Sequence, residues 1–259
     1  MSAGGPLEAD EAGGLNDGLG RLIEPETDAD PRQVKGGETP GGEAALRRAR
    51  HQIRNELQLL TSLHALHIRH VDDPRARREL LRCYRRVGVV GVVHQLTADG
   101  GGTVSAEACL TTVSDFIEAS ARTIDDSRRF DLDLDLDSLR WRHDHATRVA
   151  LIVDELFANA IDHALPDCEH PRLLLRLAAV DGRACLTLRD FGPGLPADFD
   201  PLAGETLGLP MAYAVAQQLG GDLELVAAPG GGTMAKLWLP LDPSCNPSSD
   251  SSSDSGATA

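Results

Sequence analysis

The chain has 259 residues, of which 41% are hydrophobic and 25% charged, a composition typical of a globular protein with one large or two small domains. Only 3% of the residues are aromatic, so the core must be aliphatic, and stacking platforms for single-stranded nucleic acid are disfavoured. The formal net charge of −15 argues against general DNA binding, because phosphate backbones repel an anionic protein.

No run of the sequence approaches the ~18 apolar residues of a membrane span, and the acidic N-terminus is unlike a signal peptide. The five cysteines are widely spread and odd in number, which predicts reduced thiols rather than disulfides or a zinc site. They are Cys83, Cys109, Cys168, Cys185 and Cys245. We therefore expect a cytoplasmic protein that binds neither membrane nor nucleic acid.

The two ends of the chain are polar and show no hydrophobic periodicity. Residues 1–43 carry a net charge of −7 and are rich in Gly, Pro and acidic residues, and residues 242–259 are rich in Ser. Such segments cannot bury enough apolar surface to offset the entropy of ordering them. We predict two disordered tails.

Residues 44–98, with a net charge of +7, predict a helical hairpin. A helical pattern over residues 44–70 ends near 71–74, and Pro74 opens a second pattern that runs to about Leu96. Two antiparallel helices joined by a tight turn cannot enclose a core alone. Pairing two copies into a four-helix bundle would bury their apolar stripes, so we expect a homodimer.

Residues 104–241 predict a second domain of mixed helices and strands, with a first helix over residues 104–123. The alternating stretch from Phe130 to Asp137 predicts a strand with Leu132, Leu134 and Leu136 on one face. Further helices are expected over residues 146–164 and 209–219, and strands over 172–180, 184–190, 222–227 and 233–240. Strands with helices on one face predict an α+β fold, in which the hairpin precedes an α/β sandwich.

On a helical wheel of the first helix, His51 faces away from the apolar stripe of Leu46, Ile53, Leu57 and Leu60. It lies among polar and cationic residues. A solvated imidazole can act as a nucleophile, and nearby guanidinium groups favour bound phosphate. On this pattern alone, an ordinary surface histidine, one of nine in the chain, is the favoured interpretation of His51.

Within residues 146–164, Glu155, Asn159 and His163 are spaced by four and share one helix face, with Leu156 and Ala160 on the opposite, packed side. A carboxylate one turn from an amide is a plausible face for a Mg²⁺-nucleotide. The amide oxygen is a hard ligand, and the carboxylate can orient water or accept a proton. An ordinary helix with outward polar residues would give the same pattern.

Glycine-containing turns follow. Asp190 ends a strand, and Gly192 and Gly194 after it let a ligand approach the backbone, while the carboxylate can accept hydrogen bonds from an exocyclic amine. Gly208 precedes a helix with Pro210 in its first turn, a helix N-terminus suited to phosphate. A further glycine run leads into the last strand. Each turn alone is common in proteins.

In this order the motifs resemble the nucleotide-binding domain of histidine kinases, in the ATPase superfamily that also contains gyrase. ELFANAIDHA (155–164) is similar to the N box, DFGPG (190–194) to the first glycine box, TLGLPMAYAVAQQLGG (206–221) to the second, and GGGT (230–233) to the final threonine-bearing strand. Upstream, HQIRNELQLLTSL (51–63) resembles the acceptor box of the second dimerisation-and-phosphoacceptor subfamily. The resemblance covers about residues 44–241.

The resemblance implies a two-component sensor kinase that uses ATP to phosphorylate His51 and passes the phosphoryl group to an aspartate of a separate response regulator. By match to the family motifs, Asn159 would ligate Mg²⁺, Asp190 would read the adenine amino group, and Glu155 would orient or deprotonate the acceptor. The implied nucleotide-binding set is Asn159, Asp190, Gly192, Gly194, Gly208 and Thr233. Phosphoryl transfer of this kind depends mostly on positioning and on charge neutralisation by Mg²⁺.

The sequence departs from the family pattern in three places. Phe191 stands where the usual residue is Asn, and the second box has one glycine where many relatives have two. The segment 195–207, where a nucleotide lid would lie, is short and contains Asp198, Asp200 and Glu205 but no Lys or Arg. We also expect no sensory or receiver domain, so the signal would come through the short tail or from a separate sensor protein.

Two other functions stay open, the first of them because of the acidic lid. A histidine phosphotransferase would have the same hairpin and His51, but a degenerate ATP-binding domain, and would relay phosphate between proteins. A serine kinase and binding module of the anti-sigma-factor type resembles residues 104–241 but lacks the histidine hairpin.

Overall fold

The computed structural model describes residues 40–68, 70–97, 102–124, 129–166, 168–196, 198–203 and 208–242. In the first helix it describes side chains from Arg48 onward, except those of Arg50, His51 and Arg54. Most of the two predicted tails and Glu205 of the predicted lid therefore lie outside the described residues. The chain divides into two units, residues 1–43 and 44–259, and the site lies within the second.

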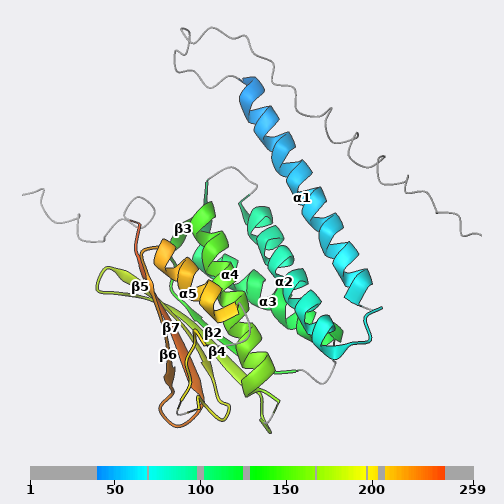
Figure 1. Cartoon of the computed structure of the whole chain (residues 1–259). Coiled ribbons are helices and arrows are strands. Elements are labelled where there is room, and N and C mark those ends of the chain that lie inside the picture. The colour runs from blue at the N-terminus through cyan, green and yellow to red at the C-terminus, as the bar shows by residue number, and fades with distance from the viewer. Residues whose placement is uncertain are drawn as a thin grey trace, which may run out of the picture. The chain divides into compact units, whose positions relative to one another are not determined.

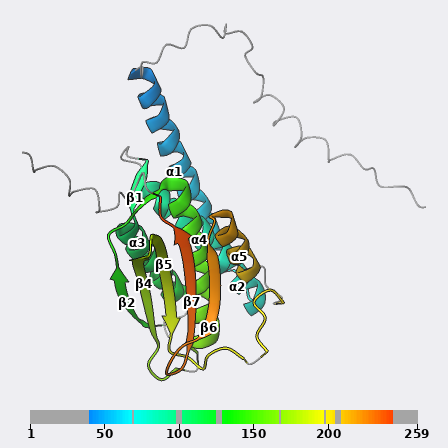
Figure 2. The same cartoon turned by 90° about the vertical axis from the view of Figure 1, so that its left-hand side faces the viewer.

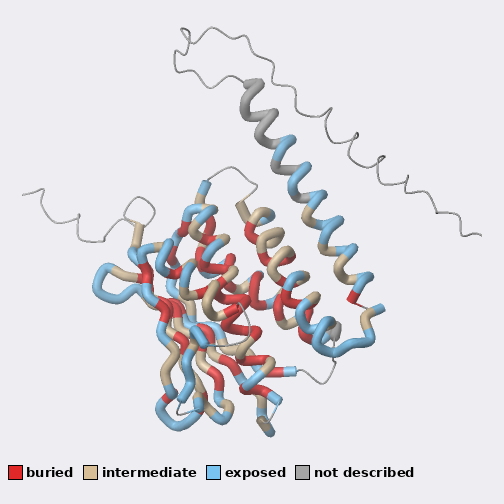
Figure 3. Tube along the Cα trace, in the orientation of Figure 1, coloured by how far each residue is buried: buried red, intermediate tan, exposed pale blue. Residues whose placement is uncertain are grey.

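The predicted pair of helices is present as α1 (Pro40–Ile68) and α2 (Pro74–Leu96). Asp73 caps α2, because its Oδ1 accepts hydrogen bonds from the N–H groups of Arg75 and Ala76 at 2.7 and 2.9 Å, and Pro74 takes the first helical position. The helices approach each other at Gly91 of α2, where an added Cβ would lie 3.9 Å from Cβ of Leu57. Most of the described part of α1 is exposed (Figure 3).

The remainder is α+β, as predicted. A five-stranded sheet has the order β2 (Asp131–Leu136), β4 (Arg172–Val180), β5 (Arg183–Asp190), β7 (Thr233–Pro240) and β6 (Asp222–Ala227). β2 runs parallel to β4, and the other neighbours are antiparallel. The helices α3 (Ala106–Ile124), α4 (His143–Asn159) and α5 (Gly208–Gln218) cover one face of the sheet (Figures 1 and 2).

The core lies between these helices and the sheet, and alternation along the strands fills it. Leu173, Leu175 and Leu177 of β4 point inward and are at most 1% exposed, because successive strand residues face opposite sides. Helix α2 belongs to the same core, since Val89 and Val93 are fully buried in it. A Cβ on Gly88 would overlap the ring of Phe116 in α3, so the two helices pack closely there. Among the described helices, none is both long and apolar enough to cross a membrane.

Two details differ from the sequence-based prediction. Two three-residue strands, β1 (Thr103–Ser105) and β3 (Arg140–Arg142), pair antiparallel as a separate sheet and are too short for alternation to reveal. The helix predicted over residues 146–164 begins at His143 and changes after Asn159 into a π-helical turn, η1 (Ala160–Ala164). The predicted strand around Leu134 is present as β2, and Leu134 is 38% exposed because β2 is an edge strand.

Candidate functional site

A cavity of about 500 Å³ lies where the end of α4 and η1 meet β5, β7 and the segment after β5. Its volume falls within the roughly 300–1,000 Å³ that is usual for small-molecule sites. Four residues predicted to bind a nucleotide line it: Asn159, Asp190, Gly194 and Thr233. Other lining residues include Leu156, Ala160, His163, Phe199 and Asp200.

Asp190 is held rigidly at the end of β5. Its Oδ1 accepts hydrogen bonds from the backbone N–H of Gly192 at 3.0 Å and of Thr233 at 2.9 Å. The turn before Thr233 comes so close that a Cβ on Gly232, whose φ is +83°, would overlap the Asp190 carbonyl oxygen. The fixed carboxylate can accept a further hydrogen bond from a ligand amine in the cavity.

Asn159 is the last residue of α4, and its side-chain amide does not make all of its possible hydrogen bonds. Its Nδ2 atom is buried and has no hydrogen-bond partner among the described residues. Leaving a buried amide unpaired costs about 1–3 kcal/mol, so a polar ligand in the cavity would recover that energy. The amide oxygen of the same side chain is a hard ligand, which suits Mg²⁺. The donor set therefore fits a polar ligand carrying a divalent cation.

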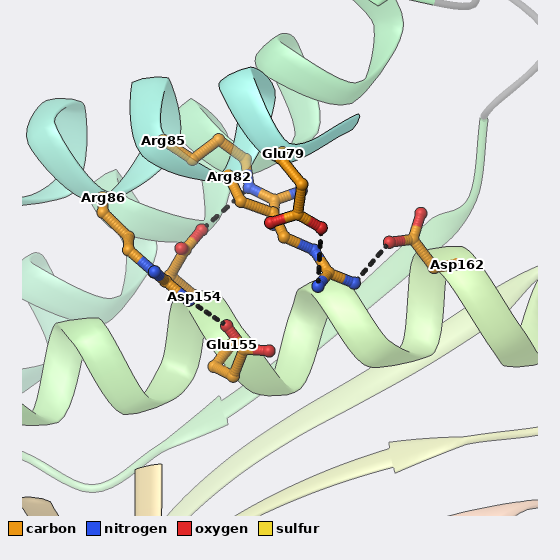
Figure 4. Close-up of polar contacts among 7 residues, drawn as sticks. All are labelled: Glu79, Arg82, Arg85, Arg86, Asp154, Glu155 and Asp162. Atoms are coloured by element: carbon orange, nitrogen blue, oxygen red, sulfur yellow. Dashed lines mark hydrogen bonds and ion pairs between the residues drawn. The ribbon is translucent and has the colours of Figure 1, made fainter. Parts of the chain in front are cut away.

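Glu155 does not line the cavity, contrary to the predicted shared face. Its side chain is 1% exposed and faces α2, where Oε2 accepts a hydrogen bond from Nη2 of Arg86 at 3.0 Å (Figure 4). Leu156 and Ala160, predicted on the packed side, line the cavity instead. At 100° per residue, Leu156 and Ala160 both lie within about 100° of Asn159 in the same direction around the helix, and Glu155 lies in the other direction. The helix face that lines the cavity therefore extends from Asn159 away from Glu155.

The other predicted glycines contribute through close packing. A Cβ on Gly192 would lie 2.7 Å from the carbonyl oxygen of Ala164, so this turn sits directly against η1. Gly208 begins α5, and a Cβ there would overlap the carboxylate of Glu155. Neither residue lines the main cavity, whereas Gly194, with φ of +87°, does.

The predicted lid follows Gly194, and its described residues form one wall of the cavity. Phe199 and Asp200 line the cavity, and both Asp198 and Asp200 are exposed. Phe191 does not line it: the guanidinium groups of Arg172 and Arg189 lie 5.2 and 4.5 Å from its ring centroid. The residue that replaces the family's Asn therefore packs against surface cations.

The structure does not describe the side chain of one predicted site residue, and it places two further residues at or next to the site that the motifs did not select. His51 lies in α1, but its side chain is outside the described residues. His163 lines the cavity, as its helical spacing from Asn159 could have indicated. Arg86 reaches Glu155 from 69 residues away, and no local pattern in the sequence indicates that pairing.

Two family models match the chain. The model described as "Histidine kinase-, DNA gyrase B-, and HSP90-like ATPase" matches residues 144–243, and the model described as "Histidine kinase" matches residues 49–121. The first contains the cavity and the second contains α2 and His51.

Curated relatives and solved structures agree with these matches. The sensor histidine kinase PdtaS of Mycolicibacterium smegmatis is 29% identical over 77% of this chain and 40% of its own length. Blue-light-activated histidine kinase 2 of Erythrobacter litoralis is 24% identical over 76% of this chain and 57% of its own. The chain therefore spans about 40–60% of these relatives.

Among solved structures, the histidine kinase domain of an Erythrobacter litoralis blue-light activated histidine kinase superposes with a TM-score of 0.56. At 22% identity, the match covers 79% of this chain and 96% of that domain, which shows a shared fold. The two family models and the curated relatives lead to one conclusion: the chain belongs to the sensor histidine kinase family.

Proposed function

We propose that the chain is an ATP-dependent histidine autokinase that phosphorylates His51 and then phosphorylates an aspartate of a response regulator. The observation that carries the proposal is the cavity that gathers Asn159, Asp190, Gly194 and Thr233 within the segment matched by the ATPase model. A fixed carboxylate and a buried amide with no partner among the described residues are suited to an adenine amino group and to a cation-bound phosphate, respectively.

In the proposed reaction, Asp190 binds the adenine amino group. Asn159 would hold Mg²⁺, which would neutralise charge on the phosphates when bound. A ring nitrogen of His51 bonds to the γ-phosphorus as the bond to the β–γ bridging oxygen breaks. ADP leaves with that electron pair, and the imidazole proton passes to Glu155 or to water. In the second transfer, a carboxylate oxygen of the regulator bonds to the same phosphorus as its bond to nitrogen breaks.

We assign residues 44–98 as the dimerisation and acceptor hairpin and residues 104–241 as the ATP-binding domain. The exposed apolar side chains of α1 support a dimer, with a second copy of the chain as the partner. They are Ile53, Leu59, Leu60, Leu63 and Leu66, each between 41% and 61% exposed. Burying them between two copies would contribute about 25 cal/mol per Å² of apolar surface.

A histidine phosphotransferase is the second candidate, and the lid favours it. The described cavity wall carries Asp200, and Asp198 is exposed nearby in sequence, so this wall repels rather than attracts phosphate. In that reading the hairpin would accept a phosphoryl group from another protein, and the cavity would not bind ATP productively.

Calorimetry with ATP decides between the two. The autokinase requires binding that depends strongly on Mg²⁺, because the surrounding acidic field repels the free nucleotide tetra-anion. Asp190→Asn should weaken binding, while Asp198→Asn, which removes the same charge from an exposed position outside the cavity lining, should not. No binding at millimolar nucleotide with Mg²⁺ would favour the phosphotransferase.

A further inference from the structure

Two turns hold the carboxylate of Asp190, and one of them is the turn that leads into β7. We call residues 228–232 the glycine turn. Directly after it, the N–H of Thr233 donates to Asp190 Oδ1 at 2.9 Å, and the N–H of Gly192, in the turn after β5, donates to the same atom at 3.0 Å. A Cβ on Gly232 would overlap the Asp190 carbonyl oxygen, so the glycine turn lies directly against the end of β5. The direction of the Asp190 carboxylate therefore depends on the position of both turns.

The glycine turn has little rigidity of its own. Gly230, Gly231 and Gly232 follow one another with φ angles of +83°, +104° and +83°. Glycine loses more conformational freedom on folding than any other residue, so holding this run in one conformation is costly. Inside the turn, the N–H of Ala228 donates to the carbonyl of Gly232 at 2.9 Å, and the N–H of Gly231 donates to the carbonyl of Ala228 at 3.1 Å. A contact from outside the turn therefore contributes directly to fixing its position.

Arg189, the residue before Asp190, makes such a contact. Its Nη2 donates a hydrogen bond to the carbonyl oxygen of Pro229 at 2.6 Å. Because successive residues of a strand face opposite sides of the sheet, the Arg189 side chain points away from Asp190, and it does not line the cavity. Its Nε is buried and has no hydrogen-bond partner among the described residues. Arg189 therefore holds the glycine turn from outside the nucleotide site.

The ring of Phe191 contacts the same guanidinium group from the other turn. The guanidinium of Arg189 lies 4.5 Å from the ring centroid, and that of Arg172 lies 5.2 Å from it. Arg172 is itself held by an ion pair with Asp133 of β2 at 2.6 Å. A planar guanidinium can stack on a ring and donate a hydrogen bond at the same time, which a Lys ammonium group does not reproduce. Arg189 thereby joins the glycine turn, through Pro229, to the turn after β5, through Phe191.

We propose that Arg189 is a positioning residue for nucleotide binding, which holds the Asp190 carboxylate in the direction that the adenine amino group requires. The inference rests on the proposed autokinase function, in which Asp190 binds that group. Arg189 does not touch the nucleotide. It acts through the glycine turn, because Thr233 at the end of that turn donates to Asp190. Phe191 keeps the guanidinium in place, a role that the family's usual Asn could not fill because an amide has no aromatic face.

A carboxylate that is fixed in advance affects binding in a specific way. A site that already has its bound geometry loses less conformational entropy when the ligand arrives. Without the contact from Arg189, the Asp190 carboxylate must be ordered each time a nucleotide binds. Because Asp190 contacts the base and not the phosphates, the loss of affinity should be equal for ATP and ADP. The rate of phosphoryl transfer should not change once the site is saturated, since the lost interaction is the same in the ground and transition states.

Variants of Arg189 and Phe191 test the contact. Arg189→Ala removes the hydrogen bond and the stacking together, and Arg189→Lys, which keeps the charge but not the planar group, is the milder variant if Arg189→Ala does not fold. The matched control is Arg183→Ala, because Arg183 lies at the opposite end of β5 and its guanidinium is 5.5 Å from the ring centroid of Trp238. It removes an equivalent cation and stacking contact away from both turns. Phe191→Leu removes the ring, and Phe191→Tyr keeps it.

Each full-length variant is compared with the wild type by thermal melting, by calorimetry with ATP and with ADP in the presence of Mg²⁺, and by the rate of acid-labile phosphate formation at saturating ATP. Arg189→Ala should weaken ATP and ADP binding by the same factor, at least about fivefold, or about 1 kcal/mol at 1.4 kcal/mol per tenfold. Its saturated rate should stay within about twofold of the wild type. Arg189→Lys and Phe191→Leu should weaken both nucleotides by a smaller factor, whereas Arg183→Ala and Phe191→Tyr should bind them as the wild type does.

A double variant separates positioning from general support of the fold. In an Asp190→Asn background, Arg189→Ala should change nucleotide affinity by less than about twofold, because the carboxylate that Arg189 positions is gone. An equal loss in both backgrounds, a loss for ATP that ADP does not share, or folded Arg189 variants that bind both nucleotides as tightly as the wild type would each overturn the inference. A failure of the proposed function looks different: the wild type and Arg183→Ala would bind neither nucleotide with Mg²⁺, and the inference would fall with it.

Discussion

Replacing Gly208 by Ala tests whether Glu155 is fixed against the start of α5. The added methyl group would overlap the Glu155 carboxylate, which is 1% exposed and has little room to move. The carboxylate must therefore leave Arg86, and a hydrogen bond between charged groups contributes about 1.5–3 kcal/mol. Because the Arg86 side chain is 29% exposed, we take the lower part of that range, about 2 kcal/mol. For a unit of this size, that corresponds to a fall in Tm of roughly 4–8 °C.

Thermal unfolding followed by circular dichroism measures this loss. Gly91→Ala is the control, because its Cβ would have an ordinary contact and Ala is preferred over Gly inside a helix by about 0.5–1 kcal/mol. In a Glu155→Ala background, Gly208→Ala should cost much less, since the clashing group is gone. A loss below about 0.5 kcal/mol, or the same loss in both backgrounds, would refute the reasoning and show that α5 simply shifts.

Three further predictions concern the site, the dimer and the pH dependence of stability. Asn159→Ala should reduce phosphate formation more than adenine binding, whereas Asp190→Asn should weaken ATP binding itself by about 1–3 kcal/mol in calorimetry, the value of a charge-assisted hydrogen bond. The double variant Leu59→Glu, Leu66→Glu should convert the proposed dimer into a monomer in light scattering, because both side chains are more than half exposed on α1, where the second copy is proposed to pack. A wild-type monomer at micromolar concentration would contradict the dimer proposal. Burial and a neighbouring histidine lower the pKa of His94, so its contribution to stability is present above pH 6.5 and is lost as the pH falls below that value. Urea unfolding between pH 8 and 5 should show this loss in the wild type and a smaller one in His94→Gln; equal slopes would contradict it.

Much of the fold could be predicted because alternation along a strand encodes its buried face directly. The predicted β4 and β7 coincide with the observed strands, since Leu173, Leu175 and Leu177, and likewise Leu237 and Leu239, recur with a period of two. A strand of three residues such as β3 has no period to detect. The π-helical turn was also missed, because its apolar spacing over five residues cannot be distinguished from that of an α-helix.

The site was predicted less completely than the fold. Motif spacing identified Asn159 and Asp190, and both line one cavity. The direction of Glu155 could not be predicted, because it depends on Arg86, a partner 69 residues away whose approach is set by tertiary packing. A helical wheel gives relative directions on one helix but not the neighbour each face meets.

Transfer of labelled phosphate from ATP is the most direct test of the central proposal. Wild type and His51→Ala are incubated with Mg²⁺ and γ-labelled ATP, and the product is exposed to acid, which hydrolyses phosphohistidine but preserves phosphoserine. We expect acid-labile label on the wild type, none on His51→Ala, and the same circular dichroism spectrum for both. Acid-stable label, or acid-labile label that persists on His51→Ala, would contradict it.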